Sequence, residues 1–384
     1  MGQRTIIILG GGMGGLVAAN ELKKQAGKNA RVILIDKSNT HIYAPSFLYL
    51  MLNKRHANEI QRPLSRLTSK GIEYVNDEII KIDTDKKIIK TRNHDFPYNY
   101  LIISLGADLV PEKISGLIQS GYNLYDLKGV EKLRDALRNF LGGRVAIVIS
   151  SLPFKCPAAP YEAAFLLDDY FQKKGMRSKT EINIFTPEAL PMPATGPENG
   201  KVIRSMLEAR NIKFYPEIQL ISVNPNKKEL VFEKKRNESF DLLIYVPPHE
   251  GPKVVRESMI GNEMGWIPVD GRTLKTKYEN VFAIGDVAAI TLISGKQLPK
   301  AGAFAHFEAE IVAKNIANEI RKVNIAKEYD GNASCFLEVG SGKAGFASGN
   351  FYTEPVPAVK MKQPARLWHW GKILFEKYWL WKWF

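Results

Sequence analysis

A glycine-rich segment at residues 10–15 constrains the fold of this chain more than any other feature of its sequence. It follows an apolar run, residues 5–9, that predicts a buried strand, and a helical pattern begins directly after it. Gly10, Gly12 and Gly15 have the G-x-G-x-x-G spacing. In a strand–turn–helix unit the first glycine permits a tight turn, the second lets a pyrophosphate approach the backbone, and the third lets the helix pack on the strand.

An acidic residue follows the next predicted strand. Residues 31–35 are apolar enough for a second buried strand, and Asp36 comes directly after them. A carboxylate at this place can accept a hydrogen bond from a ribose hydroxyl, while the pyrophosphate lies at the helix N-terminus. The turn and this acid together predict an α/β domain that binds a dinucleotide, with a plain glycine-rich turn as the lesser alternative.

A second strand–turn–helix unit has no glycines in its turn. An apolar strand is predicted for residues 145–149 and a helix for residues 163–171, and the segment between them contains Cys156. Since a helix N-terminus favours a thiolate over a thiol, we interpret this as a nucleotide-binding turn converted into a sulfur site. The alternative is a buried, unreactive cysteine. Glu188 follows the next strand of this unit, and without a glycine loop we interpret it as a surface cap.

The chain then returns to its first domain. Residues 280–286 predict a strand that ends in Gly285 and Asp286, where the acid can hydrogen-bond the ribityl or phosphate part of a flavin. A helix is predicted from about residue 301 to residue 320, directly after Lys300, which either stabilises an anionic reduced flavin ring or is only a solvated charge. The complete set of residues expected to bind the cofactor is Gly10, Gly12, Gly14, Gly15, Asp36, Lys37, Ile79, Gly106, Gly285, Asp286 and Lys300.

These motifs divide the 384 residues into two Rossmann-like dinucleotide-binding domains and a C-terminal region. The first, discontinuous domain is expected at residues 1–107 and 271–325, the second at 108–270, and the C-terminal region at 326–384. A net charge of +14 suits an anionic partner such as an anionic membrane or a phosphate-bearing cofactor. No basic block is interleaved with aromatic residues in the body of the chain, so we expect no nucleic acid; we also expect no metal.

The C-terminal residues 366–384 contain five of the six tryptophans. Apolar residues at helical spacing alternate there with Arg366, Lys372, Lys377 and Lys382, and tryptophan and lysine are typical of a membrane–water interface. The segment is too short and too charged to span a bilayer, so it predicts a monotopic anchor; a tail that packs on its own core or on a partner chain is the alternative. The stripe consists of Leu367, Trp370, Leu374, Tyr378 and Trp381.

The chain resembles sulfide:quinone oxidoreductase, a two-dinucleotide-domain flavoprotein of the disulfide-reductase type, and its relative, the flavoprotein subunit of flavocytochrome c sulfide dehydrogenase. The specific part of the resemblance is Cys156 in Lys-Cys-Pro-Ala-Ala-Pro-Tyr-Glu and Cys335 in Asn-Ala-Ser-Cys. It implies FAD and two cysteines that handle sulfide sulfur beside the flavin. Many members carry a third cysteine early in the second domain. None occurs here between Asp108 and Arg144, which puts a covalent flavin link through that residue in doubt.

We therefore expect a peripheral membrane enzyme, on the cytoplasmic side because no leader precedes the first strand, that oxidises hydrogen sulfide to zero-valent sulfur or polysulfide and reduces membrane quinone. Expected catalytic residues are Cys156, Cys335, Glu162 and Lys300; Glu162 is either a proton acceptor or an ordinary first-turn helix acid. Candidate walls of a quinone site are Phe304, Phe346 and Phe351. Alternatives are a cytochrome-linked sulfide dehydrogenase, a type II NADH:quinone oxidoreductase and a non-catalytic sulfur carrier or flavin-binding protein. A homo-oligomer is left open.

Overall fold

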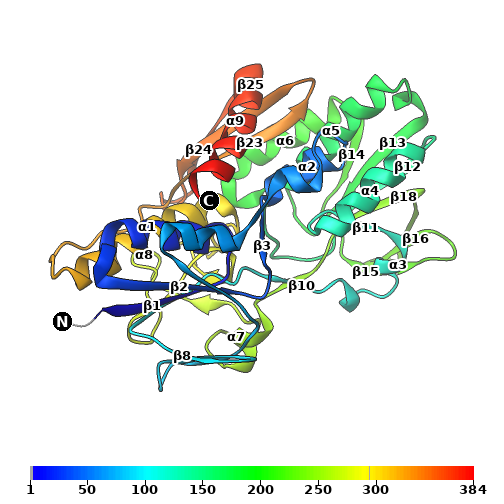
Figure 1. Cartoon of the computed structure of the whole chain (residues 1–384). Helices are drawn as coiled ribbons and strands as arrows, with labels where there is room; N and C mark the ends of the chain where they lie inside the picture. The colour runs from blue at the N-terminus through cyan, green and yellow to red at the C-terminus, as the bar shows by residue number, and fades with distance from the viewer. Residues whose placement is uncertain (1–2, 294) are drawn as a thin grey trace.

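The computed structural model describes residues 3–293 and 295–384, and two five-stranded parallel sheets form its framework (Figure 1). The first sheet has the order β21–β9–β1–β2–β5, and every neighbouring pair is parallel. Its strands are β1 (Arg4–Leu9), β2 (Ala30–Asp36), β5 (Glu73–Asn76), β9 (Tyr100–Ile103) and β21 (Val281–Ala283). This arrangement follows from the buried Ile/Leu/Val runs, because a parallel strand covered on both faces is apolar along its whole length.

The second sheet repeats the design. Its order is β11–β18–β12–β13–β14, again with parallel neighbours. Its strands are β11 (Tyr122–Asn123), β12 (Gly143–Ile149), β13 (Thr180–Phe185), β14 (Ile212–Tyr215) and β18 (Leu242–Val246). The predicted α/β fold with two Rossmann-like sheets is therefore confirmed.

Helices cover these sheets and connect their strands. They are α1 (Met13–Ala26), α2 (Phe47–Leu50), α3 (Leu117–Ser120), α4 (Leu127–Asn139), α5 (Ala159–Lys173), α6 (Pro197–Glu208), α7 (Lys253–Glu257), α8 (Gly302–Ile320) and α9 (Arg366–Lys382). The short antiparallel pairs and ribbons are β3 (Thr40–Ile42) with β4 (Gln61–Pro63), β6 (Ile79–Asp83) with β7 (Ile88–Thr91) and β8 (Asp95–Pro97), β10 (Asp108–Leu109) with β19 (His249–Glu250), and β15 (Leu220–Asn224) with β16 (Glu229–Phe232) and β17 (Asn237–Ser239). A short parallel pair is formed by β20 (Ile267–Pro268) and β22 (Ala288–Ala289).

A third, antiparallel sheet lies between the second domain and α9. It consists of β23 (Asn332–Gly340), β24 (Lys343–Asn350) and β25 (Ala358–Ala365) in that order. Helix α9, red in Figure 1, runs beside this sheet, and the chain ends near α1. Leu337 and Val339 of β23 share an apolar core with α5, so this sheet joins the C-terminal region to the Cys156-bearing unit.

Two segments pack across the predicted domain boundaries. Val255, Ile260 and Ile267 lie in the core beneath the first sheet, so residues around α7 belong with that sheet although they precede residue 271. Phe47 and Leu50 of α2 pack in the core of the second unit. Linear boundaries at residues 107 and 270 miss both exchanges, because an apolar side chain carries no sequence mark of which core it enters.

Candidate active site

The glycine turn after β1 has the geometry that its spacing predicts. Gly10 has a φ of +96°, which favours glycine, and a Cβ on Gly15 would lie 1.9 Å from the Gly10 carbonyl oxygen. A Cβ on Gly14 would lie 2.8 Å from the Ser104 hydroxyl oxygen. A Cβ on Gly12 would meet no atom of the described residues within 4 Å. The turn is thus closely packed on two sides and open at Gly12, which is the cradle that a pyrophosphate needs.

Asp36 lies beside this turn at the end of β2. Its two carboxylate oxygens accept hydrogen bonds from the N–H groups of Gly11 (2.5 Å) and Ser38 (2.7 Å). Burial raises the pKa of Asp36, while these two backbone hydrogen bonds act to lower it. Lys37 is exposed and Ile79 is half-buried just beyond this edge of the sheet. The role of these three residues toward a ribose or adenine stays a prediction.

Asp286 supports the flavin assignment through an unsatisfied atom. It is deeply placed, burial raises its pKa, and its Oδ1 has no hydrogen-bond partner among residues 3–293 and 295–384. A buried polar atom without a partner is costly, and a flavin ribityl hydroxyl is the kind of donor that satisfies it. Gly285 (φ +70°) and Gly106 (φ +69°) provide the flanking turns. The residues present therefore fit FAD.

Lys300 is not a solvated charge, so that interpretation is wrong. It is 7% exposed, and its Nζ donates to the carbonyl oxygens of Asp286 (2.6 Å) and Ala288 (3.1 Å). The ammonium also lies 3.9 Å from the ring centroid of Trp266, and burial lowers its pKa to about 8. Its contact with a reduced flavin stays a prediction.

Cys156 lies in the turn that replaces the second glycine loop. This turn runs from residue 150 to residue 158, and α5 begins at Ala159. Cys156 has a φ of +49°, and its N–H donates to the Lys300 carbonyl oxygen at 2.6 Å. The Tyr125 hydroxyl donates to the Cys156 carbonyl oxygen at 3.0 Å. A backbone hydrogen bond therefore connects the turn that carries Cys156 to the segment around Lys300, directly before α8.

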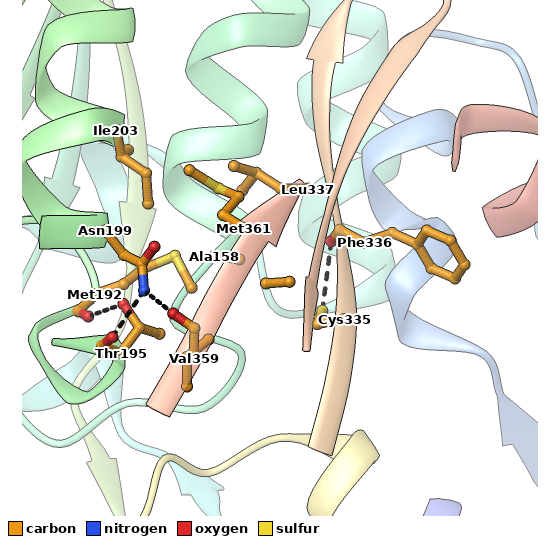
Figure 2. A pocket seen from close by; sticks show the side chains of 11 residues that line it. Ala158, Met192, Thr195, Asn199, Ile203, Cys335, Phe336, Leu337, Val359 and Met361 are labelled. Atoms are coloured by element: carbon orange, nitrogen blue, oxygen red, sulfur yellow. Dashed lines mark hydrogen bonds between the residues drawn. The ribbon is translucent and has the colours of Figure 1, made fainter. Parts of the chain in front are cut away.

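Cys335 lies on β23 and faces the same unit. Because side chains alternate along a strand, Cys335 shares its face with Leu337 and Val339, which pack with α5, whereas Phe336 is on the opposite face. Figure 2 shows the Phe336 ring pointing away from the other side chains of the hollow beside Cys335. The lining of that hollow is Ala158, Met192, Thr195, Asn199, Ile203, Cys335, Phe336, Leu337, Ala347, Val359 and Met361. Both cysteines are free thiols.

The two thiols belong to one electrostatic neighbourhood. Burial raises the pKa of Cys156, and the charges of Cys335 and Glu162 raise it further. Desolvation of the thiol raises the pKa of Cys335 to about 11, and the charge of Glu162 adds to this rise. Cys335 as a residue is nevertheless exposed to solvent. Burial therefore acts against the Cys156 thiolate that the helix start is expected to favour. The charge of Lys372 lowers the pKa of both thiols.

Glu162 is a buried partner of the C-terminal helix. Its carboxylate accepts hydrogen bonds from the Lys372 ammonium (2.6 Å) and the Glu338 N–H (2.7 Å). Burial raises the pKa of Glu162. Burial acts to lower the pKa of Lys372, but the charges of Glu162 and Glu338 outweigh it, and the pKa is raised. Glu162 is thus more than a first-turn helix acid; its part in proton transfer stays a prediction.

Glu188 corrects another sequence interpretation. It is 3% exposed and not a surface cap; the Tyr161 hydroxyl, from the first turn of α5, donates to its carboxylate, and so does the Thr186 hydroxyl at 3.2 Å. Burial raises the pKa of Glu188 to about 7. A side-chain bridge therefore closes the space between the start of α5 and the end of β13, where a second dinucleotide would lie.

Helix α9 turns polar residues inward and apolar residues outward. Besides Lys372, the inner face carries His369, which binds Glu338 (2.9 Å), and Glu376, which binds Arg55 (2.9 Å) and accepts from Ser46 (2.5 Å). Trp379 and Trp383 complete this face in the core. The outward apolar residues are exposed by 45–74%: Leu367, Trp370, Leu374, Tyr378 and Trp381. The predicted stripe thus faces outward, whereas Lys372 faces inward. Trp379 and Trp383 pack in the protein's own core, as the alternative to a membrane anchor predicts for the tail.

The three candidate quinone phenylalanines do not form one wall. Phe304 and Phe351 pack edge to face, 4.9 Å between ring centroids, in the core of the first unit. Phe346 stacks on Trp368 at 4.8 Å and contacts Phe336 at 5.2 Å, beside α9. These phenylalanines could not be separated from the sequence, because aromatic residues occur in cores and in binding sites alike.

Sequence reasoning also missed the inner-face network of α9. His369, Lys372 and Glu376 recur at helical spacing opposite the apolar stripe, and this spacing was a readable signal. Their partners Glu338, Glu162 and Arg55 come from distant segments, and the sequence has no pattern that pairs them. Sequence reasoning likewise missed three residues that line the hollow beside Cys335: Met192, Thr195 and Asn199. They lie in and beside the proline-rich loop before α6.

Comparison with known proteins gives a consistent result. A family profile described as pyridine nucleotide-disulphide oxidoreductase matches residues 4–309. The mitochondrial sulfide:quinone oxidoreductase of Mus musculus is 28% identical over 93% of this chain and 80% of its own length. The X-ray structure of the sulfide:quinone oxidoreductase of Aquifex aeolicus superposes with a TM-score of 0.89 at 24% identity, covering 99% and 91% of the two chains. A type II NADH:quinone oxidoreductase of Staphylococcus saprophyticus is 23% identical over 87% and 88%.

Proposed function

The chain belongs to the pyridine nucleotide-disulphide oxidoreductase family, and from this premise we propose that it is an FAD-dependent sulfide:quinone oxidoreductase. The observation that carries the proposal is geometric: Ala158, two residues after Cys156, lines the same hollow as Cys335, and the Cys156 N–H donates to the Lys300 carbonyl oxygen. The names of similar curated proteins agree with it.

The overall reaction balances without a further reactant. Hydrogen sulfide loses two electrons and two protons as its sulfur becomes zero-valent, and quinone takes up two electrons and two protons. When bound, FAD supplies the two-electron relay between these half-reactions. The two cysteines can carry the sulfur in turn. One cysteine thiol and hydrosulfide form a persulfide and release one proton, while two electrons pass to the bound flavin. The thiolate of the other cysteine can then attack the outer sulfur, which moves to it as the first cysteine leaves as a thiolate.

The chain's own residues set the reactivity of these thiols. Lys372 places a positive charge near both cysteines, which offsets part of the rise in pKa that burial causes. Glu162 holds that ammonium, and we propose it as the acceptor of the proton from a reacting thiol. The hollow beside Cys335 has a largely apolar lining, and Cys335 itself is exposed, so hydrosulfide can reach this thiol from solution.

The second turn argues against a nicotinamide nucleotide as electron donor. Its pyrophosphate would need a glycine loop, and residues 150–158 provide prolines and a cysteine instead. The bridge between Tyr161 and Glu188 further occupies the position of the ribose-binding acid. These features favour sulfide over NADH as the reductant.

The outer face of α9 is the proposed membrane contact. Among residues 3–293 and 295–384, no helix is long and apolar enough to cross a bilayer. The exposed apolar stripe is accompanied by Arg366, Lys377 and Lys382, whereas the one acid of the helix, Glu376, is turned inward and is 1% exposed. An apolar face rimmed by cations suits the interface of an anionic leaflet. Quinone would then reach the enzyme from the lipid, beside Phe346 and Trp368.

An anaerobic titration of the purified protein tests the reductant. We expect sulfide to bleach the flavin absorbance within one turnover and a soluble quinone to restore it, whereas NADH leaves it unchanged. Rapid bleaching by NADH without bleaching by sulfide would refute the proposal.

Cosedimentation with vesicles tests the membrane contact. The protein should bind phosphatidylglycerol-containing vesicles, and the variant Leu374→Glu/Trp381→Glu should not. Retained binding by that variant would show that the outer face of α9 is not the contact.

A further inference from the structure

We infer that the C-terminal helix holds the glycine turn in its FAD-binding conformation, through two hydrogen bonds that run from Trp379 to His41 and from His41 to Gly11. The inference rests on the FAD binding proposed above and assigns His41 and Trp379 as positioning residues. They are 338 positions apart in sequence, and only the folded chain brings them together.

The two hydrogen bonds require one tautomer of His41. Its Nδ1 lies 2.9 Å from the Gly11 carbonyl oxygen, and the Trp379 Nε1 lies 3.2 Å from its Nε2. A carbonyl oxygen only accepts and an indole N–H only donates, so Nδ1 carries the proton and Nε2 accepts. His41 is 2% exposed and Trp379 is 1% exposed, so water does not compete for either bond.

The two hydrogen bonds affect the glycine turn because they end at Gly11. The Gly11 N–H donates to Asp36 and the Gly11 carbonyl accepts from His41, so both sides of this residue are fixed. In a planar trans peptide the N–H of the next residue points opposite to the carbonyl. The bond to His41 therefore directs the Gly12 N–H away from His41. Gly12 is also the residue whose Cβ would meet no described atom within 4 Å.

The end of α9 is anchored so that this chain of bonds is rigid. Asn20 of α1 donates to the Trp383 carbonyl oxygen (3.2 Å), and Lys70 donates to the Lys382 carbonyl oxygen (2.8 Å). The His306 ring of α8 packs against Trp379, 5.6 Å between centroids. A helix that is pinned to both helices flanking the glycine turn can transmit its position to that turn.

Paired tryptophan substitutions test the inference. Trp379→Phe removes the indole donor but keeps an aromatic ring in place. Trp383→Phe is the matched control, because Trp383 lies on the same buried face and its Nε1 has no hydrogen-bond partner in the part of the chain that the structure describes. After dilution of the loaded protein, free-flavin fluorescence should rise about tenfold faster for Trp379→Phe than for Trp383→Phe, which should release FAD like the wild type.

Substitutions of His41 separate the two bonds. His41→Asn keeps an amide donor near the Gly11 carbonyl but loses the acceptor for Trp379, so it should match Trp379→Phe. His41→Leu loses both bonds and should release FAD faster still. Circular dichroism melting of each apoprotein reports whether the variant folds. Equal release rates for Trp379→Phe and Trp383→Phe, with tight FAD binding by the wild type, would overturn this inference alone; a wild type that binds no FAD would refute the proposed function as well.

Discussion

The turn after β1 and the turn after β12 differ although they occupy the same place in the same kind of sheet. Both central strands have a parallel neighbour on each side, and four of the five strands have corresponding places in the two sheets. The fifth, outer strand comes last in the first sheet (β21) and first in the second sheet (β11). The first turn consists largely of glycine and is open at Gly12; the second contains prolines and Cys156. The sheet therefore provides only the position of a turn, and the residues of the turn decide whether that position receives a nucleotide or holds a thiol.

The acids beside the two turns show the same divergence. Asp36 uses its carboxylate to hold the backbone of its glycine turn, at the edge where a ribose would lie. Glu188 is bound by Tyr161 from the opposite helix, in a closed and buried position. An acid after the second strand is thus not by itself a sign of nucleotide binding; what matters is whether a side chain from the following helix already occupies it.

The largest expected effect comes from removing either of the two thiols, Cys156 of the second turn or Cys335 of β23. Cys156→Ser and Cys335→Ser should each lower the rate of flavin reduction by sulfide about a thousandfold or more, because an alcohol does not replace a thiolate as a sulfur nucleophile. Stopped-flow flavin absorbance measures this rate. Dithionite should still reduce both variants fully, as the control for cofactor binding, and full sulfide activity in either variant would remove that cysteine from the mechanism.

The second turn should also depend on α9 through Lys372. Lys372→Met leaves the Glu162 carboxylate buried without its cation, which should cost about 3–5 kcal/mol of unfolding free energy. The charge of Lys372 lowers the pKa of both thiols, so the pH dependence of flavin reduction by sulfide should also move to higher pH. Denaturant titration and a pH–rate profile measure the two effects.

Lys377→Met is the matched control on the exposed side of the same helix. Its ammonium is solvated and lies 3.5 Å from Glu376, which keeps its bond to Arg55. We expect less than about 1 kcal/mol of change and no shift of the profile. Similar losses for both lysine variants would mean that general helix charge, not the Glu162 pair, stabilises this region.

The first turn should respond to a single methyl group in a position-dependent way. Gly12→Ala adds a Cβ to open space, so the apoprotein should unfold as the wild type does, whereas FAD binding should weaken by about 1–3 kcal/mol, roughly 5- to 150-fold. Gly15→Ala places its Cβ against the Gly10 carbonyl and should destabilise the apoprotein itself. Unchanged FAD affinity in Gly12→Ala would show that the pyrophosphate does not lie on this backbone.

Much of the fold was predictable because its signals are local. The glycine spacing, the apolar runs and the stripe of α9 each occupy fewer than about 20 consecutive residues, which is the range over which helix and strand periodicity operate. The outward orientation of Leu367, Trp370 and Trp381 could be predicted for the same reason.

The site was predictable only in part because its contacts are distant in sequence. Lys372 reads as one more interfacial cation until Glu162, 210 positions away, is placed opposite it. The sequence indicates a surface acid at Glu188 because it does not show the contact of this residue with Tyr161. The contact between His41 and Trp379 likewise has no signal in the sequence. Burial of Cys156, which raises the pKa of its thiol, could not be predicted either, since desolvation depends on the surroundings in three dimensions.

The smallest expected effect distinguishes the closed acid of the second turn from the open one of the first. Burial raises the pKa of Glu188 to about 7, above its ordinary value of 4.5, so the folded state binds a proton that the unfolded state has released between these values. Stability from this group is present below pH 4.5 and is lost as the pH rises through 7, by roughly 2 kcal/mol between about pH 5 and pH 7. Glu188→Gln cannot titrate and should flatten that part of the profile of unfolding free energy against pH. An unchanged slope in the Gln variant would mean that Glu188 is ionised in the folded protein, and that the space between α5 and β13 is more open to water than the bridge to Tyr161 implies.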